Sequence, residues 1–484
     1  MTESNRIRKN SFFSLASISL RLIANVIVFW IIARFYGPTL FGQFTFAQTL
    51  ASIFILFGDF GFDVLLTNEI ARDRHNAVKI FRQFFSLKLV FTVFALAGMW
   101  VFALISNFSS QAYILIIVFS FYMVFTTLTN FLYALYKGLE RLEYETKVSI
   151  IINFSLLITV LILILFKVEL LFIAIVFVLT RLLGFGISIR YSRELLQGIS
   201  FRLFFKEIKI VKNKIFVYGF HLTFSYLFFQ LDTILLAIWK GDYDVGIYQA
   251  VFKLIAIPLV IPDILINALM PTLSRLYIEN KKEWARVGRL MYKLLVAIII
   301  PISIILYVFS DQIIHLIYGT DKFTPAIPLL RIFALILFVR FNLETFALMI
   351  TTSDKQKVRM FVVIAATFLN FTINYIMIPR FGVYGAALTS LGTNIFVGIC
   401  YMLATSPLFL QWIVNLKTII TLIVSFLLAY LFWTIKSISM FIAAPVLLLS
   451  LGLLSYYFYF NKEEKRIILL ENLKLFSPDF KINK

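Results

Sequence analysis

The feature that most constrains the fold is a run of long apolar stretches between Ser11 and Asn461, separated by short polar connectors. About 20 consecutive apolar residues span the hydrocarbon core of a bilayer as a helix. A helix satisfies its own backbone hydrogen bonds, which lipid cannot do. We therefore expect an all-α polytopic membrane protein with about 14 transmembrane helices.

Each predicted span is bounded by charged or turn-forming residues. The spans are 11–33, 41–66, 83–105, 112–136, 148–166, 168–189, 215–239, 246–273, 290–310, 327–350, 360–378, 384–406, 417–435 and 440–460. An even number of spans places both termini on the same side. Pro258 and Pro262 fall inside one span and predict a kink there, because proline cannot donate a helical hydrogen bond.

The basic residues of the connectors predict the orientation. If the N-terminus is inside, 33 of the 45 Lys and Arg residues lie in inner segments, 7 lie in outer segments and the rest lie within spans. Inner loops of membrane proteins carry such an excess of Lys and Arg. We expect a multi-pass protein of the bacterial inner (plasma) membrane with both termini in the cytoplasm. Anionic lipid headgroups, rather than nucleic acid, account for the net charge of +20.

Several classes of function lack their sequence signatures. Cys400 is the only cysteine, and the three histidines have no metal-ligand spacing. No phosphate-binding loop of the GxxxxGK[ST] type occurs. The connectors are too short to form a catalytic domain, so we expect a transporter rather than an enzyme. We expect no metal and no cofactor.

An internal repeat indicates a two-lobed transporter. Residues 33–44 align with residues 237–248 at a constant offset of 204, which pairs Gly37 with Gly241 and Gly42 with Gly246. Parallel repeats with a substrate site between them are a common transporter plan. We expect two six-helix lobes in a pseudo-twofold arrangement, followed by two extra helices. The predicted regions are an N-lobe at 1–189, a cytoplasmic linker at 190–214, a C-lobe at 215–406, the extra spans at 407–460 and a cytoplasmic tail at 461–484.

The turn sequences also resemble those of a known family. The matching segments, in chain order, are Ala33 to Phe44, Phe57 to Gly61 with Glu69 to Arg72, Lys137 to Arg141, Val245 to Tyr248, and Pro379 to Ala387. They resemble the polysaccharide transporters of the multidrug/oligosaccharidyl-lipid/polysaccharide (MOP) exporter superfamily. The closest subgroup is the Wzx-type O-antigen flippases, and the resemblance extends over nearly the whole chain.

That resemblance implies a function and partners. Such a flippase moves an undecaprenyl-pyrophosphate-linked oligosaccharide, a repeat unit of O-antigen lipopolysaccharide or a related polysaccharide, from the cytoplasmic to the periplasmic leaflet by alternating access. Membrane lipids and other polysaccharide-assembly proteins are the implied partners. Proton or sodium coupling remains open, because no residue pattern selects between them.

Charged residues within the spans are the candidate site, because burying a charge in lipid is costly. Arg21, Lys253 and Arg340 lie deep enough to contact a pyrophosphate. Asp232, Asp263 and Glu344 are candidate cavity acids or ion-pair partners. We expect Lys88, Arg181 and Asp59 to be interfacial, with the two cations extending to the cytoplasmic headgroups.

The candidates can be ranked by whether an oppositely charged residue is placed to form an ion pair with each of them. Arg340 and Glu344 are four residues apart and share a helix face. Asp232 and Lys253 lie at similar depth on consecutive antiparallel spans. Arg21 has no acid at helical spacing in its own span. We therefore rank Arg21 first as a pyrophosphate contact, because a guanidinium can bond two phosphate oxygens at once.

Two other functions remain open from the sequence. A cation-coupled multidrug exporter of the same superfamily needs a negatively biased cavity, and the deep cations and acids are balanced three to three. A membrane glycan polymerase or ligase is expected to carry a large periplasmic loop, which this chain lacks.

Overall fold

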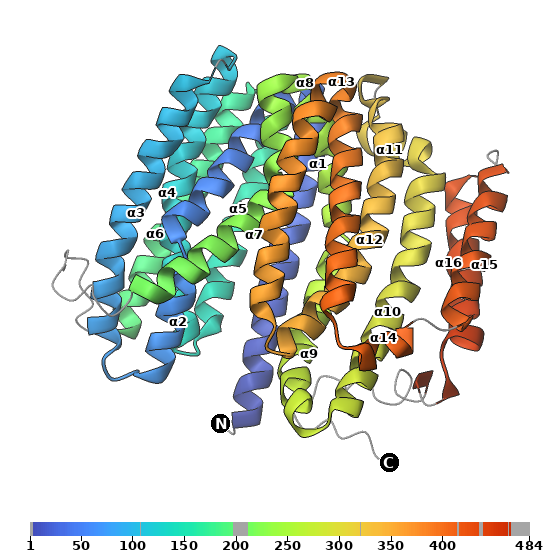
Figure 1. The fold of residues 1–484 in the computed structure, drawn as a ribbon. Helices are drawn as coiled ribbons and strands as arrows, with labels where there is room; N and C mark the ends of the chain where they lie inside the picture. Colours follow the sequence, from blue (N-terminus) through green and yellow to red (C-terminus); the bar gives the residue numbers. More distant parts are fainter. Residues whose placement is uncertain are drawn as a thin grey trace. The chain divides into compact units, whose positions relative to one another are not determined.

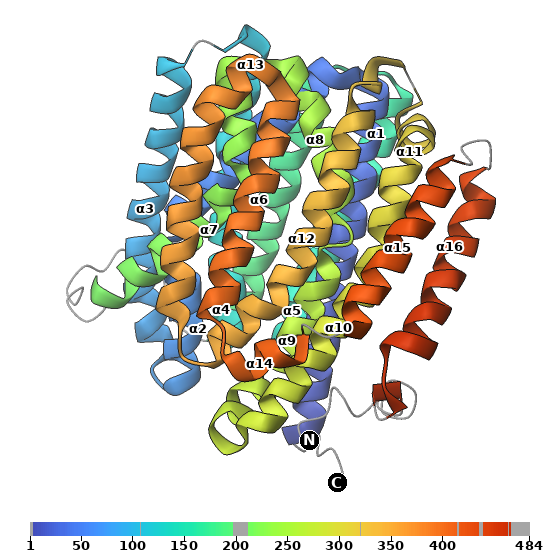
Figure 2. The same ribbon diagram turned by 45° about the vertical axis from the view of Figure 1, so that its right-hand side comes forward.

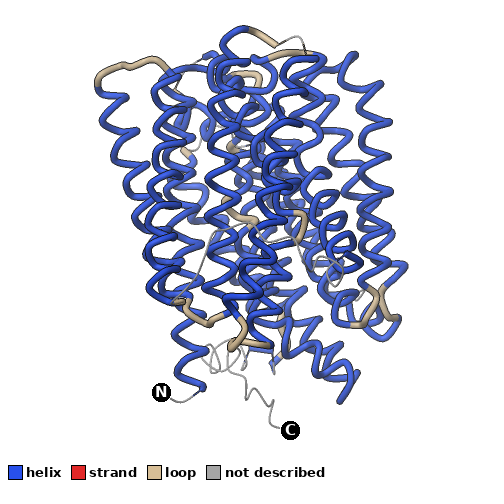
Figure 3. Tube along the Cα trace, turned by 90° about the vertical axis from the view of Figure 1, so that its left-hand side faces the viewer, coloured by secondary structure: helices blue, strands red, loops and turns tan. Residues whose placement is uncertain are grey.

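The computed structural model describes residues 3–106, 108–196, 212–319, 321–413, 416–434, 439–462 and 464–465. All regular structure in these residues is helical (Figure 3). The predicted linker lies largely outside this part of the chain, and so does the tail beyond residue 465. Nine of the described helices are long and apolar enough to cross a membrane, or ten if one bent pair counts as a span. The all-α membrane fold expected from the sequence is confirmed.

The chain divides into two compact units, Met1–Ala250 and Val251–Lys484. In the first unit the helices are α1 (Glu3–Asp59), α2 (Phe62–Arg72), α3 (Ala77–Ile105), α4 (Ser110–Gly138), α5 (Leu142–Leu165), α6 (Leu170–Leu195), α7 (Lys212–Trp239) and most of α8 (Asp242–Ala256). The lobe boundaries drawn from the sequence remain a prediction.

The second unit continues with eight helical elements after α8. They are α9 (Val260–Glu279), α10 (Lys281–Val308), α11 (Ser310–Tyr318), α12 (Ala326–Thr352), α13 (Gln356–Ala404), α14 (Pro407–Ile413), α15 (Leu416–Thr434) and α16 (Met440–Leu454). Short 3₁₀ and π turns follow α11 and α16. Within this unit α12 packs between α10 and α13 (Figure 2).

Two long helices bend at glycines that the sequence placed in connectors. In α1 the backbone of Gly37 has φ 75°, and in α13 that of Gly382 has φ 56°. Positive φ suits glycine, because it has no Cβ to clash with the backbone. Figure 1 shows α13 as two arms that meet at this bend. Each bend therefore joins two consecutive predicted spans.

One boundary predicted from the sequence is wrong. The second span was expected to run to residue 66, but α1 ends at Asp59. Phe60 and Gly61 then adopt positive φ of 44° and 90°, and α2 begins at Phe62. Residues with a left-handed backbone conformation cannot continue a right-handed helix, which explains why α1 ends before residue 66. The kink predicted by Pro258 and Pro262 is confirmed, because α8 and α9 meet at 42°.

The two repeated turns pack against each other inside the first unit. A Cβ atom on Gly42 would overlap the carbonyl oxygen of Asp242, and one on Gly246 would overlap that of Pro38. The Gln43 amide donates to the Asp242 carboxylate at 2.8 Å, and the Ser109 hydroxyl donates to the same oxygen at 3.0 Å. These bonds fasten the start of α8 to α1 and to the start of α4.

Candidate substrate-binding residues

Lys88 of α3 lies in a buried ion cluster. Its ammonium donates to Asp59 Oδ1 at 2.8 Å and to Asp63 Oδ1 at 2.9 Å, and its side chain has no exposed surface. The expectation that Lys88 extends to the headgroups is therefore wrong. The cause is the break after Asp59, which presents two carboxylates toward α3. This triad holds the α1–α2 break in place, and its ammonium is not available to a substrate.

Arg181 of α6 also differs from the interfacial expectation. Its guanidinium carbon lies 5.3 Å from the centre of the Tyr122 ring on α4. The helix continues for fourteen residues beyond Arg181, about 21 Å at 1.5 Å per residue. Its Nε is buried and has no hydrogen-bond partner. In the described part of the chain Arg181 has no carboxylate partner, so its charge is compensated only by an aromatic face.

Arg21 of α1 is the first-ranked candidate from the sequence, and its side chain is exposed on the first unit. Arg21 and Arg181 both interact electrostatically with Tyr133 of α4. Neither arginine forms an ion pair with a described acid. The structure therefore brings two guanidinium groups within electrostatic range of one tyrosine, which the sequence did not predict. Glu145 acts on the same tyrosine, and it forms an ion pair with Lys137 at 3.4 Å.

A polar network continues from this arginine pair. The hydroxyl of Tyr226, on α7, hydrogen-bonds with Ser52 on α1 and with Gln230 one turn further along α7. Tyr226 also interacts electrostatically with Tyr122, the ring under Arg181. The Gln48 side chain donates to the Ser52 hydroxyl at 3.4 Å. These hydroxyls and amides inside apolar helices can bond a polar headgroup.

The sequence reasoning missed Tyr122, Tyr133, Tyr226 and Gln230 because it considered only charged residues within spans. Each of these residues lies inside a predicted span, where a hydroxyl or an amide needs a partner. That requirement was the available signal.

Asp232 is buried on α7 and accepts a hydrogen bond from the Tyr248 hydroxyl of α8 at 2.7 Å. One residue further on both helices, the Gln249 amide donates to the Thr233 hydroxyl at 2.7 Å. These bonds link α7 to α8 within the first unit. Lys253 belongs to the second unit, and its predicted pairing with Asp232 remains a prediction.

Arg340 belongs to a charge cluster in the second unit. It lies on α12 and interacts electrostatically with Glu344 one turn later and with Asp263 of α9. Arg359 of α13 acts on Glu344 as well, and it donates to the Thr351 hydroxyl at 3.2 Å. The sequence reasoning counted Arg359 only as a connector charge. Two cations and two acids balance here, unlike the arginine pair of the first unit.

No group of three or more His, Cys, Asp or Glu side chains suited to a metal ion occurs among the described residues. The chemistry available to these residues is that of binding. In the first unit it comprises hydroxyls, amides and two guanidinium groups that form no ion pair with a described acid, and in the second unit it comprises a cluster of two cations and two acids.

Comparisons with known proteins agree with the superfamily resemblance of the sequence. A family profile described as polysaccharide biosynthesis protein matches residues 7–277, which is more than half of the chain. A second profile, described as MatE, matches residues 219–376. The family matches confirm the superfamily resemblance drawn from the turn motifs. No curated protein matches the chain.

Solved structures share the fold. An inward closed structure named lipid II flippase MurJ aligns with a TM-score of 0.69 at 16% identity and covers 92% of this chain and 98% of its own. An inward-facing multidrug resistance MATE family transporter of the MOP superfamily aligns at 0.64 and 14% identity, covering 81% and 97%. An outward-facing MATE structure aligns at 0.59 and 16% identity, covering 83% and 94%. These structures are named as a flippase and as transporters rather than as enzymes, in keeping with the expectation for this chain.

Proposed function

This chain belongs to the family of polysaccharide biosynthesis proteins, and we propose that it is a flippase for an undecaprenyl-pyrophosphate-linked oligosaccharide. It moves this lipid from the cytoplasmic to the periplasmic leaflet of the bacterial inner membrane by alternating access. The substrate is a repeat unit of O-antigen or of a related surface polysaccharide. Both termini of the protein lie in the cytoplasm.

The observation that carries the proposal is that Arg21 and Arg181 both act electrostatically on Tyr133, and that neither forms an ion pair with an acid of the described residues. A pyrophosphate cannot cross hydrocarbon unless its charge is compensated and its hydration replaced. Guanidinium groups bond phosphate oxygens in pairs, which an ammonium cannot do with the same geometry. The Tyr226 network supplies hydroxyl and amide partners for the first sugars.

The family and the shared fold support this choice of substrate class. The family description concerns polysaccharide biosynthesis. The neighbour with 98% of its length aligned is named as a flippase of lipid II. A lipid-linked saccharide is a kind of substrate that fits both descriptions.

A cation-coupled multidrug exporter is the second candidate. Asp263 and Glu344 in the second unit could bind a proton, a sodium ion or a cationic drug, and MATE transporters share the fold. Arg340 and Arg359 oppose this reading, because Arg340 acts electrostatically on both acids and Arg359 acts on Glu344. Arg21 and Arg181, which form no ion pair with a described acid, would repel a cationic drug.

The test is a deletion strain with no other flippase of the class. We expect surface polysaccharide to disappear while lipid-linked repeat units accumulate on the cytoplasmic face, and the wild-type gene to restore both. Drug susceptibility is measured in the same strains. Normal surface polysaccharide together with increased drug sensitivity would contradict the flippase assignment and favour multidrug export as the function.

A further inference from the structure

Two buried polar side chains of α7 have an oxygen atom without a hydrogen-bond partner. Thr223 and Gln230 are each 8% exposed. The hydroxyl of Thr223 and the carbonyl oxygen Oε1 of Gln230 have no partner within the described part of the chain. Burying a polar atom without a partner costs free energy, so its presence inside a span calls for an explanation. A ligand that bonds both atoms would supply one.

These two side chains belong to a polar strip of the first unit, the α1–α7 strip. It consists of Gln48 and Ser52 on α1 and of Thr223, Tyr226 and Gln230 on α7, each set at helical spacing, and α1 packs against α7. The Tyr226 hydroxyl hydrogen-bonds with Ser52 and with Gln230, and the Gln48 amide donates to Ser52 at 3.4 Å. Gln48, Ser52 and Tyr226 are partly exposed, so a ligand can reach the strip.

The α1–α7 strip lies deep within its two helices. On α7, Gln230 and Thr223 precede Trp239, the last residue of the helix, by 9 and 16 residues. These positions are about 14 Å and 24 Å from that end along the helix. On α1 the strip begins 11 residues after the Gly37 bend, at a similar depth. Transporters commonly bind their substrates near the middle of the membrane, so the strip is placed where a substrate passes.

The chemistry of the unpartnered atoms favours a saccharide over a phosphate. The amide oxygen of Gln230 is an acceptor only, so its partner must donate an O–H or an N–H group. The oxygens of an ionised phosphate are acceptors and cannot bond it. Sugar hydroxyls both donate and accept, which suits Gln230 as well as the Thr223 hydroxyl. The two residues are about 10 Å apart along α7, close to the length of a disaccharide.

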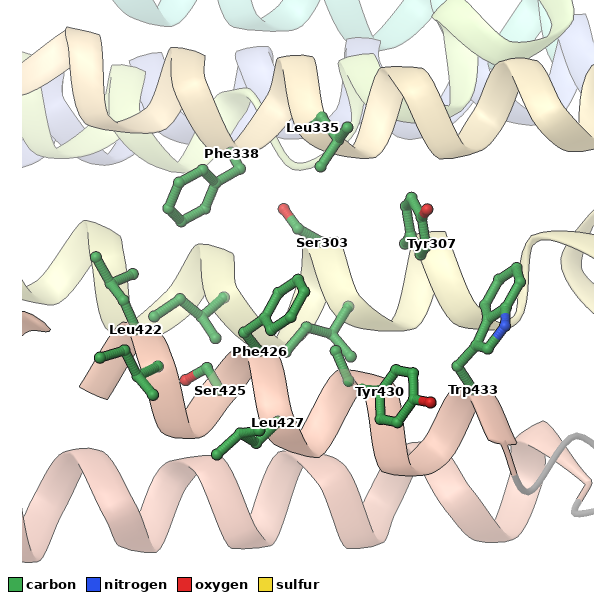
Figure 4. Close-up of a pocket in the computed structure, with 14 residues that line it drawn as sticks. Ser303, Tyr307, Leu335, Phe338, Leu422, Ser425, Phe426, Leu427, Tyr430 and Trp433 are labelled. Atoms are coloured by element: carbon green, nitrogen blue, oxygen red, sulfur yellow. The ribbon is translucent and has the colours of Figure 1, made fainter. Parts of the chain in front are cut away.

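A groove of the second unit provides a contrast. It has a volume of about 810 Å³ between α10, α12 and α15, and most of its lining residues are apolar, such as Leu335, Phe338 and Phe426 (Figure 4). Among the lining residues, all of which the structure describes, only Ser303 has a buried oxygen without a partner. A saccharide placed there would lose its hydration without replacement. Volume alone therefore does not make a saccharide site.

We propose that the α1–α7 strip binds the saccharide of the lipid-linked substrate, while Arg21 and Arg181 bind its pyrophosphate. This inference rests on the proposed function. In it, Thr223 and Gln230 select a saccharide with free hydroxyl groups at the positions they contact. A site that bonds a substrate hydroxyl discriminates strongly against an analogue without it, because the polar groups of the site are then left unpaired. A repeat unit with a deoxy sugar at this position is therefore a poor substrate.

The experiment compares the affinity of the full chain in nanodiscs for two lipids. One is the lipid-linked repeat unit extracted from the deletion strain, and the other is undecaprenyl pyrophosphate, which has no sugar. Thr223→Val and Gln230→Leu should each weaken binding of the repeat unit roughly tenfold, as expected for the loss of one hydrogen bond. Binding of undecaprenyl pyrophosphate should not change. Thr223→Ser keeps the hydroxyl and should bind both lipids as the wild type does.

Ser303→Ala is the matched control, because it removes an equally buried, unpartnered hydroxyl outside the strip, and it should alter neither affinity. Arg21→Ala should weaken binding of both lipids. The ratio of the two affinities within one variant does not depend on a partly unfolded fraction.

Equal losses for the two lipids in Thr223→Val and Gln230→Leu would overturn the inference by assigning both residues to helix packing, and so would the absence of any loss. A wild-type chain that binds the two lipids equally well would overturn the inference and leave the proposed flippase intact. A wild-type chain that binds neither lipid would contradict the proposed function itself, and the inference with it.

Discussion

Gly42 and Gly246 face each other backbone to backbone. A Cβ atom on Gly42 would lie 2.8 Å from the amide nitrogen of Gly246. The two glycines occupy equivalent positions of the repeat, and so do Pro38 and Asp242. Gly42 approaches Asp242, while Gly246 approaches Pro38. Such reciprocal contacts are typical of a twofold axis, and this one relates the two copies of the repeated turn.

Alanine at either glycine should disturb this contact. Gly246→Ala forces a methyl group into the Pro38 carbonyl, and we expect a loss of about 1–3 kcal/mol, as for overpacked cores. The measurement is the thermal transition of detergent-solubilised protein by size-exclusion chromatography. Gly186→Ala is the control, because a Cβ there meets nothing within 4 Å. Equal transitions for the two variants would contradict the close packing.

The ion cluster around Lys88 makes a prediction about stability. Lys88→Met leaves Asp59 and Asp63 buried without their cation, which should cost about 3–5 kcal/mol. Adding Asp59→Asn and Asp63→Asn to Lys88→Met should recover much of the loss, because no unpaired charge then remains. Thermal stability is compared among the wild type, Lys88→Met, the double variant Asp59→Asn/Asp63→Asn and the triple variant. A triple variant no more stable than Lys88→Met would argue against the cluster as a structural element.

Arg21 and Arg181 should be required for transport rather than for folding. Arg21→Ala is expected to abolish surface polysaccharide in a complemented deletion strain at normal membrane abundance. Arg21→Lys and Arg181→Lys should restore it in part, because an ammonium lacks the bidentate fork. Arg34→Ala is the control, since this arginine lies in a predicted outer connector. Full complementation by Arg21→Ala would remove Arg21 from the site.

The second unit should respond differently, because its charges are balanced. Arg340→Ala and Glu344→Ala should cause similar, weaker losses of export, since each leaves a counter-charge of the cluster without one partner. The exchange of both residues, Arg340→Glu with Glu344→Arg, keeps the charge and should recover part of the activity. Activity normalised to protein level is the readout. An exchange variant that is less active than either single variant would indicate a direct substrate contact.

The predicted orientation can be tested by labelling. In a Cys400→Ala background, Ser110→Cys at the start of α4 should react with membrane-impermeant maleimide in cells with a permeabilised outer membrane. His75→Cys, between α2 and α3, should be protected until the cells are lysed. Both positions are exposed in the structure, so accessibility to solvent does not differ between them. The reverse pattern would invert the topology and the direction of transport.

The sequence by itself determined the elements of this protein. Long apolar stretches predicted the helices, Gly37 and Gly382 marked the bends within α1 and α13, and Pro258 marked the break between α8 and α9. Each depends on local chemistry, namely hydropathy, positive φ or a missing amide hydrogen. The repeat was visible too, because the same local chemistry recurs after 204 residues.

Only the tertiary structure decided which side chains meet. Lys88 and Arg181 looked interfacial, yet one is enclosed by two carboxylates and the other lies over Tyr122. Hydropathy states how deep a residue lies but not how its helix is rotated about its axis. Contacts between helices depend on that rotation, and it follows from the packing of the whole unit.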